Sequence, residues 1–269
     1  MKKVLFLSVV LLAGSVFAQV NVDGVIGAGE WTGHMYTDAV GSYGAEGLTS
    51  TALSEAGSPA DLYTWGARIE NGVFYGMFQL NPAALKAISA YDLAIDPVSG
   101  KTTKIYLGYC VDFDQNASTG HAQDDFASEG ARWDAMLEVG VDYGTLMDLG
   151  KGVGQTGHSI NLWNSNGTAF DNDVNISTGA NSAVVYNGYV LEFSVAVNDI
   201  LGAFVATDGA VAGDEWAMGA RVAANLRFGA SDYLADTGSV EAVTVPEPAT
   251  LVLLGVGSLL LKRRKAKSN

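Results

Sequence analysis

Hydrophobic positions in the middle of the chain recur mainly with the two-residue period of β-strands. From Asp61 to Leu80, two stretches rich in aromatic and β-branched residues flank the pair Asn71-Gly72. A second pair, Asn187-Gly188, precedes a stretch at 189–196 in which large hydrophobic residues alternate with smaller or polar ones. Asn-Gly between two such runs is the strongest short-range signal for a hairpin. We therefore predict two β-hairpins.

The remaining pattern predicts many short strands and little helix. Further strands are expected at 34–38, 91–95, 103–112, 132–139, 159–163 and 215–226. Helical patterns are limited to Pro82–Ala90 and Asn198–Phe204, the second with Asn198 as its N-cap. Short strands, frequent glycine and no Pro- or Ser-rich linker predict an all-β fold, a single jelly-roll-like antiparallel β-sandwich over residues 20–244.

The N-terminal segment has the three-part pattern of an export signal. Two lysines precede an apolar run from Val4 to Leu12, and small residues lead up to Ala18. This pattern predicts a signal peptide at 1–18, with a helical apolar core and cleavage after Ala18. Because a signal peptide directs export, the rest of the chain is expected to work outside the cytoplasm. A buried first helix is the alternative interpretation of residues 1–18.

The C-terminal segment predicts a short transmembrane helix. Pro246-Glu247-Pro248 is followed by an apolar stretch at 249–261 and then by a basic cluster at 262–265. Thirteen helical residues span roughly 20 Å, which is less than the roughly 30 Å hydrocarbon core. Basic residues hold such an end on the cytoplasmic side. The segment is therefore interpreted as a temporary stop-transfer device.

Residues 245–269 as a unit resemble the PEP-CTERM sorting signal, with Pro246, Glu247 and Pro248 matching the motif that names it. The resemblance implies that exosortase, a membrane-embedded protease, removes the helix and passes the protein to the cell surface or to an exopolysaccharide (biofilm) matrix. The two prolines agree with this role, because they keep the segment extended beside the bilayer. An ordinary tail anchor is the alternative.

The net charge of the region between the two terminal segments limits the classes of partner that it can bind. The chain has 15 Lys and Arg against 29 Asp and Glu, and seven of the basic residues lie in the two terminal segments. Residues 20–245 therefore hold eight basic and 28 acidic side chains, a net charge of −20. Nucleic acid and anionic lipid surfaces are excluded as partners, because binding them requires Lys and Arg. The single cysteine, Cys110, lies in an apolar run and is expected to be a buried thiol.

One loop has the composition of a calcium site. Oxygen-bearing side chains alternate after a predicted strand, and two further carboxylates follow within ten residues. Ca²⁺ takes six to eight such oxygen ligands. The loop is not an EF-hand, because Ala117 and Gln123 stand where that motif needs Gly and Glu. An Asx-rich turn with solvated charges is the alternative. The predicted ligands are Asp112, Asp114, Asn116, Asp124 and Asp125.

Tryptophans are candidate platforms for sugar rings. Trp163 is favoured for binding, with Asn161 and Asn164 as flanking amides that could bond hydroxyl groups. Packing in the core is the alternative for this residue. The other four tryptophans are expected to pack inside the fold or at its entry: Trp31, Trp65, Trp133 and Trp216.

Scattered segments of the body resemble landmarks of the carbohydrate-binding family 9-like and DOMON-like sandwiches. They are Val22–Ile26 with Gly29-Glu30-Trp31, Val111–Asn116, Trp133-Asp134 and Gly188–Val195. The resemblance implies a two-sheet sandwich that binds a sugar or, in some branches, haem. The chain has no c-type haem attachment motif, so no organic cofactor is expected.

Catalytic motifs are missing from the sequence. It has no G-x-S-x-G and no H-E-x-x-H, and the G-x-G-x-x-G at 152–157 lacks a βαβ context and is interpreted as a hairpin loop. We therefore predict a non-catalytic, exported, carbohydrate-binding β-sandwich. A purely structural or adhesive surface protein is the first alternative, and a secreted glycan hydrolase is the second.

Overall fold

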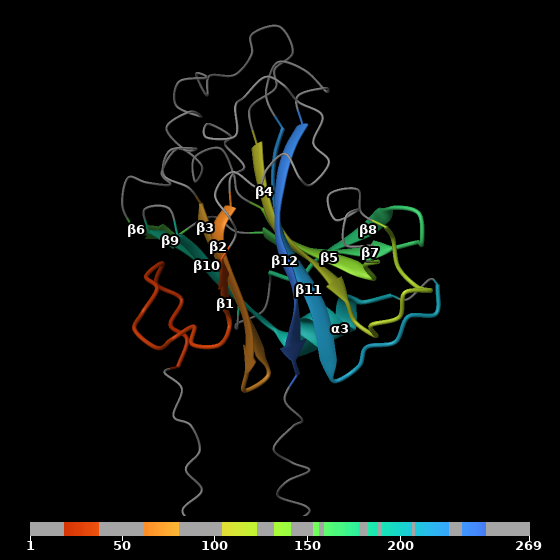
Figure 1. Ribbon diagram of the computed structural model, residues 1–269, viewed down its shortest axis with the longest axis horizontal. Coiled ribbons are helices and arrows are strands. Elements are labelled where there is room, and N and C mark those ends of the chain that lie inside the picture. The colour runs from red at the N-terminus through yellow and green to blue at the C-terminus, as the bar shows by residue number, and fades with distance from the viewer. Residues whose placement is uncertain are drawn as a thin grey trace, which may run out of the picture.

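The fold is described from a computed structural model (Figure 1). The structure describes residues 19–37, 62–80, 104–122, 132–140, 153–155, 159–177, 182–187, 190–205, 208–225 and 233–245. The predicted signal helix, transmembrane helix, strand 91–95 and helix Pro82–Ala90 lie outside these ranges. Within them, no helix combines the length and the hydrophobicity needed to cross a membrane.

Two antiparallel six-stranded sheets make up the described fold, as an all-β sandwich requires. Sheet A has the order β1 (Met35–Thr37), β2 (Leu62–Glu70), β3 (Val73–Leu80), β10 (Val190–Ala196), β9 (Ala183–Asn187) and β6 (Val153–Gln155). Sheet B has the order β12 (Tyr233–Thr244), β11 (Glu215–Asn225), β4 (Lys104–Asp112), β5 (Ala135–Gly140), β7 (Ser159–Ser165) and β8 (Phe170–Asn175). A single described helix, α3 (Val197–Ala203), follows β10.

Both hairpins expected from Asn-Gly pairs are present. Asn71 and Gly72 have φ values of 52° and 76°, the left-handed conformation that a tight two-residue hairpin turn requires. Around them Glu70 pairs with Val73. In the second hairpin Asn187 pairs with Val190, so β9 and β10 are neighbours in sheet A.

Three strands and one helix start differ from the expectation. β6 occupies part of the G-x-G-x-x-G segment that was expected to be a loop, because it adds to the edge of β9. β8 and β12 were not predicted. The helix α3 starts at Val197, whose N–H donates to Gly72 O at 2.9 Å. The N-cap is Ala196 and makes no side-chain cap bond, so Asn198 lies inside the first turn and is not the cap.

The core lies between the sheets and is built from their alternating inward positions. Tyr109 at its centre is fully buried, and its hydroxyl donates to Gly66 O at 2.6 Å and accepts from Met77 N at 3.0 Å. Phe193 packs directly on Gly76, where an added Cβ would lie 2.2 Å from the ring. The polar edge of the tyrosine is thus satisfied while the rings of both sheets interdigitate.

The N-terminal segment 19–34 covers the outer face of sheet A. Val20 and Trp31 are buried against Met77 of β3 and form a second small hydrophobic cluster there. On sheet B, β4, β5 and β7 are consecutive neighbours. This order brings the end of β4, the start of β5 and the outer face of β7 into one region, which holds the predicted sites.

Candidate functional site

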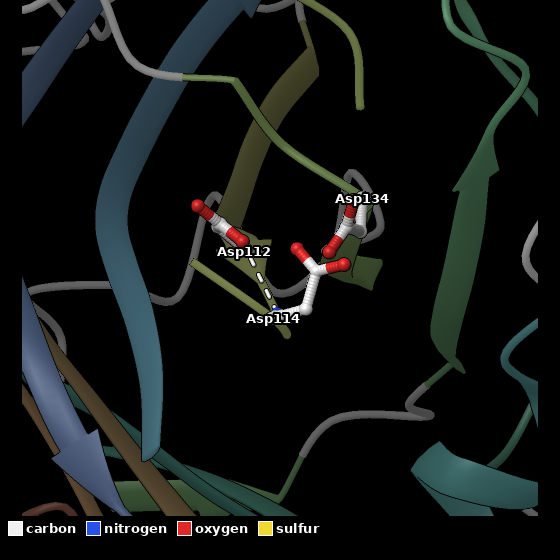
Figure 2. A group of neighbouring side chains, drawn as sticks. All are labelled: Asp112, Asp114 and Asp134. Carbon is white, nitrogen blue, oxygen red and sulfur yellow. Dashed lines mark hydrogen bonds between the residues drawn. The ribbon is translucent and has the colours of Figure 1, made fainter. Parts of the chain in front are cut away.

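Three carboxylates converge where β4 ends and β5 begins (Figure 2). Asp112 is the last residue of β4, Asp114 follows in the loop, and Asp134 immediately precedes β5. One oxygen from each lies within 4.8 Å of the others. Because Val111 pairs with Ala135 across the two antiparallel strands, the residues just beyond this pair lie beside each other.

Four hydrogen bonds from backbone N–H groups, three of the loop after β4 and one of the segment at 211, hold the carboxylates of Asp112 and Asp114. Asp112 Oδ1 accepts from Gln115 N at 2.6 Å and from Asp114 N at 3.2 Å. Asp114 Oδ1 accepts from Asn116 N at 3.0 Å, and Asp114 Oδ2 accepts from Val211 N at 3.2 Å. These bonds fix the directions in which the two carboxylates point.

Asp134 is the buried member of the group, with 3 % of its surface exposed. Its Oδ2 accepts from Phe113 N at 2.8 Å. The pKa of Asp134 is raised to about 7, mainly by burial and also by the negative charges of Asp112, Asp114 and Asp208, against the opposing effect of the Phe113 N–H. Burial also raises the pKa of Asp112. A hard divalent cation would remove this repulsion, and carboxylate oxygens are the ligands that Ca²⁺ prefers.

A second set of contacts braces the far side of the loop. Arg132 donates to the carbonyl oxygen of Gly120 from Nη2 at 2.7 Å and to that of Thr119 from Nε at 3.1 Å. Gly120 N donates to Asp208 Oδ2 at 2.6 Å. Gly120 has φ of +78°, and an added Cβ would lie 2.6 Å from the backbone of Trp133, so this position requires glycine. The loop is therefore anchored to the segment that carries Asp134.

The predicted ligands divide into three groups. The structure brings Asp112 and Asp114 together. Asn116 is exposed, and its side-chain oxygen accepts from Ser118 N at 3.0 Å. Asp124 and Asp125 lie outside the described residues. Asp134 was missed as a candidate ligand, although an antiparallel pairing of the predicted strands 103–112 and 132–139 would have placed it beside Asp112.

Trp163 lies on the outer face of sheet B. Its neighbours Ile160 and Leu162 point into the core, while Trp163 and Asn161 alternate outwards and are partly exposed. The indole Nε1 donates to Glu138 Oε1 at 3.3 Å on the neighbouring strand β5. Asn161 Oδ1 is a buried atom that has no hydrogen-bond partner among the described residues. The structure therefore brings Trp163 and Asn161 to one polar face.

Asn164 belongs to a different environment from Trp163. The two-residue alternation of β7 continues through Asn164, which therefore lies on the inward side with Ile160 and Leu162 and is 2 % exposed. Its Nδ2 donates to Ala203 O at 3.1 Å, and its Oδ1 accepts from Val205 N at 2.9 Å. The amide that was expected to flank the indole instead holds the end of α3.

Two charged residues complete the outer face and were missed from the sequence. Burial raises the pKa of Glu138, while the Trp163 indole and the positive charge of Arg221 oppose the rise. Asp173 pairs with Trp163 from strand β8 and adds a further negative charge beside Glu138. No motif marks these residues, because each comes from a different strand.

The other tryptophans are packed, as expected. Trp65, Trp133 and Trp216 are at most 1 % exposed, and Trp31 is 3 % exposed. Cys110 is fully buried beside Trp133. None of these five side chains is available to a glycan.

A third polar cluster joins the N-terminal segment to sheet A. The carboxylate of Glu192 accepts from Asp23 N at 3.1 Å, from Gly24 N at 2.8 Å and from Trp31 Nε1 at 3.0 Å. Burial raises the pKa of Glu192 to about 7, and these three N–H donors limit the rise. The N-terminal segment and strand β10, which are 160 or more positions apart in the sequence, thus meet at the carboxylate of Glu192.

Glu30 repeats this arrangement within the N-terminal segment. It is 4 % exposed, and its carboxylate accepts from Gly27 N at 2.8 Å and from Asn21 N. Its carbonyl oxygen accepts from Arg68 Nη1 at 2.8 Å on β2. Both carboxylates are occupied by protein donors, so this cluster fastens the segment to the sheet.

Comparison with known proteins supports the C-terminal part of the sequence interpretation. Residues 244–266 match the PEP-CTERM protein-sorting motif. The resemblance of the body to carbohydrate-binding family 9-like and DOMON-like sandwiches is not confirmed by a family or a homologue. No curated protein matches the chain, and no solved structure does either. The motif supports an exported protein that transits the membrane and is processed by exosortase.

Proposed function

We propose that this protein is a non-catalytic, carbohydrate-binding component of the cell surface or of the extracellular polysaccharide. The sorting motif at 244–266 supports export and exosortase processing. The sandwich is then the part that remains and acts outside the cell. Its net charge of −20 over residues 20–245 disfavours acidic polymers, so neutral or cationic glycans are the proposed ligands.

The placement of Trp163 carries this proposal. Its indole is partly exposed on the outer face of sheet B, while the other four tryptophans are buried. An aromatic face stacks on the apolar face of a pyranose ring, and nearby polar groups bond its hydroxyls. Asn161 and Glu138 supply such groups on the same face.

Calcium is proposed as a structural ion at Asp112, Asp114 and Asp134. The three carboxylates lie at one end of β4 and β5, and Asp134 is buried. The loop that they would share with the ion is braced by Arg132 and Asp208. Bound calcium would therefore stabilise this end of sheet B without taking part in a reaction.

The glycan proposal is tested by binding of the mature protein to a panel of neutral and amino-sugar polysaccharides. We expect binding that Trp163→Ala abolishes, because the stacking surface is lost, while folding is preserved. Tyr63→Ala is the matched control, since Tyr63 is an aromatic residue that is 39 % exposed on sheet A.

Two results would replace the proposal. Absence of binding to every polysaccharide, with a cooperative unfolding transition retained, would favour a structural or adhesive protein. Release of sugar products, abolished by changing one carboxylate, would favour a glycan hydrolase.

A further inference from the structure

The sandwich ends where the sorting motif begins. Thr244 is the last residue of β12 and pairs with Glu215, and Val243 is a core residue that is 1 % exposed. Val245 still donates from its N–H to Asp214 O at 2.7 Å. The motif match starts at residue 244. The folded body is therefore not separated from the sorting segment by a linker.

Only three residues connect this folded end to the apolar stretch 249–261. From Val245 to Ala249, a fully extended chain covers at most about 14 Å between Cα atoms. The headgroup layer on one side of a bilayer takes up roughly 5–7 Å of that length. When the apolar stretch lies in the hydrocarbon core, the end of β12 is thus within about one side-chain length of the headgroups.

Other parts of the sandwich lie at this same end. Figure 1 shows the end of β12, the start of β11 and the β2–β3 turn together at the lower edge of the molecule. Asn71, Gly72, Asp214 and Glu215 are exposed there. We call these four residues, together with Val245, the exit face.

We infer that, in the membrane-anchored precursor, the exit face rests against the lipid headgroups. The inference rests on the membrane transit that the sorting motif implies, and it is independent of glycan binding at Trp163. Asp214 and Glu215 give the exit face a negative charge, which provides no attraction to anionic lipid. The short connection, and not adhesion, holds the face in contact. Exosortase must then reach Pro246-Glu247-Pro248 within this narrow gap.

Site-specific labelling of the precursor tests the inference. The precursor is purified from membranes of cells that lack exosortase and is reconstituted into phosphatidylcholine vesicles, with flotation as the check on anchoring. A fluorophore is attached at Asp214→Cys on the exit face or at Tyr63→Cys. Tyr63 precedes the end of β2 by seven residues, about 23 Å along the strand. Cys110 is fully buried, so the introduced thiols are the ones labelled.

A headgroup-attached quencher should reduce fluorescence at position 214 about threefold or more relative to position 63, because only the exit face lies within contact range. A flexible spacer of about 15 Gly and Ser residues, inserted between Val245 and Pro246, should remove the difference, because such a chain reaches roughly 20 Å. Equal quenching at both positions without the spacer would overturn the inference. Quenching at position 214 that survives the spacer would also overturn it, since the connection would then not be what holds the face.

Discussion

Glu192 and Asp134 are both buried carboxyl groups whose pKa is raised to about 7, yet their surroundings differ. Glu192 is fully buried and accepts three hydrogen bonds from N–H groups of the N-terminal segment. Asp134 accepts one from Phe113 N and faces two further carboxylates. Burial alone therefore does not identify a ligand site. The distinction lies in whether the protein itself supplies the donors.

Removal of the Glu192 carboxylate should have the largest effect on stability. Glu192→Ala leaves the N–H groups of Asp23, Gly24 and Trp31 without their acceptor. Each buried unsatisfied group costs roughly 1–3 kcal/mol, so the free energy of unfolding should fall by about 3 kcal/mol or more. Urea unfolding measures the loss, with the exposed Glu215→Ala as the control that changes it by about 0.5 kcal/mol or less. An equally small effect of Glu192→Ala would mean that the N-terminal segment does not depend on this carboxylate.

The raised pKa of Glu192 also predicts that the stability depends on pH. The folded state holds a proton on Glu192 up to about pH 7, whereas the unfolded chain releases it near 4.5. The contribution of Glu192 protonation to the free energy of unfolding is therefore fully present below pH 4.5 and is lost as the pH rises through 7. The urea midpoint should fall between pH 5 and pH 8, and Glu192→Gln should flatten this fall. Parallel pH profiles for the two proteins would contradict the assignment.

Neutralising Asp134 should have the smallest effect, and with the opposite sign. In EDTA, Asp134→Asn removes a buried charge that faces Asp112 and Asp114 while an amide oxygen can still accept from Phe113 N. We expect the free energy of unfolding to stay within about 1 kcal/mol of the wild type or to rise, because repulsion is relieved. A loss as large as that of Glu192→Ala would show that Asp134 is instead a structural acceptor.

Much of the sheet architecture follows from local patterns. The Asn71-Gly72 turn and the strands β4, β7 and β11 agree with the alternating hydrophobic runs and with turn chemistry. β8 reads FDNDVN, in which only Phe170 and Val174 are hydrophobic, and it is a strand because it extends the edge of β7. β6 arises in the same way at the edge of β9. Such edge strands depend on their partner and have little signal of their own.

The candidate sites depended on pairings that a sequence does not display. Asp112 and Asp114 were recognised because they are close in the chain. Asp134 joins them through the register of β4 with β5. Asn164 was misplaced for another reason, because the two-residue alternation of β7 already puts it on the inward side with Leu162 and opposite to Trp163. Glu192 meets Asp23 and Trp31 across the whole length of the body.

Calcium titration followed by thermal unfolding tests most directly the claim that a buried carboxylate without sufficient donors marks a cation site. Wild-type protein in excess Ca²⁺ should unfold at a higher temperature than in EDTA, with a gain of about 2.7 kcal/mol at a calcium concentration 100 times the dissociation constant. Asp134→Asn should lose most of this gain, and Asp199→Asn, in the first turn of α3, should keep it. Identical melting curves with calcium and with EDTA would contradict the claim.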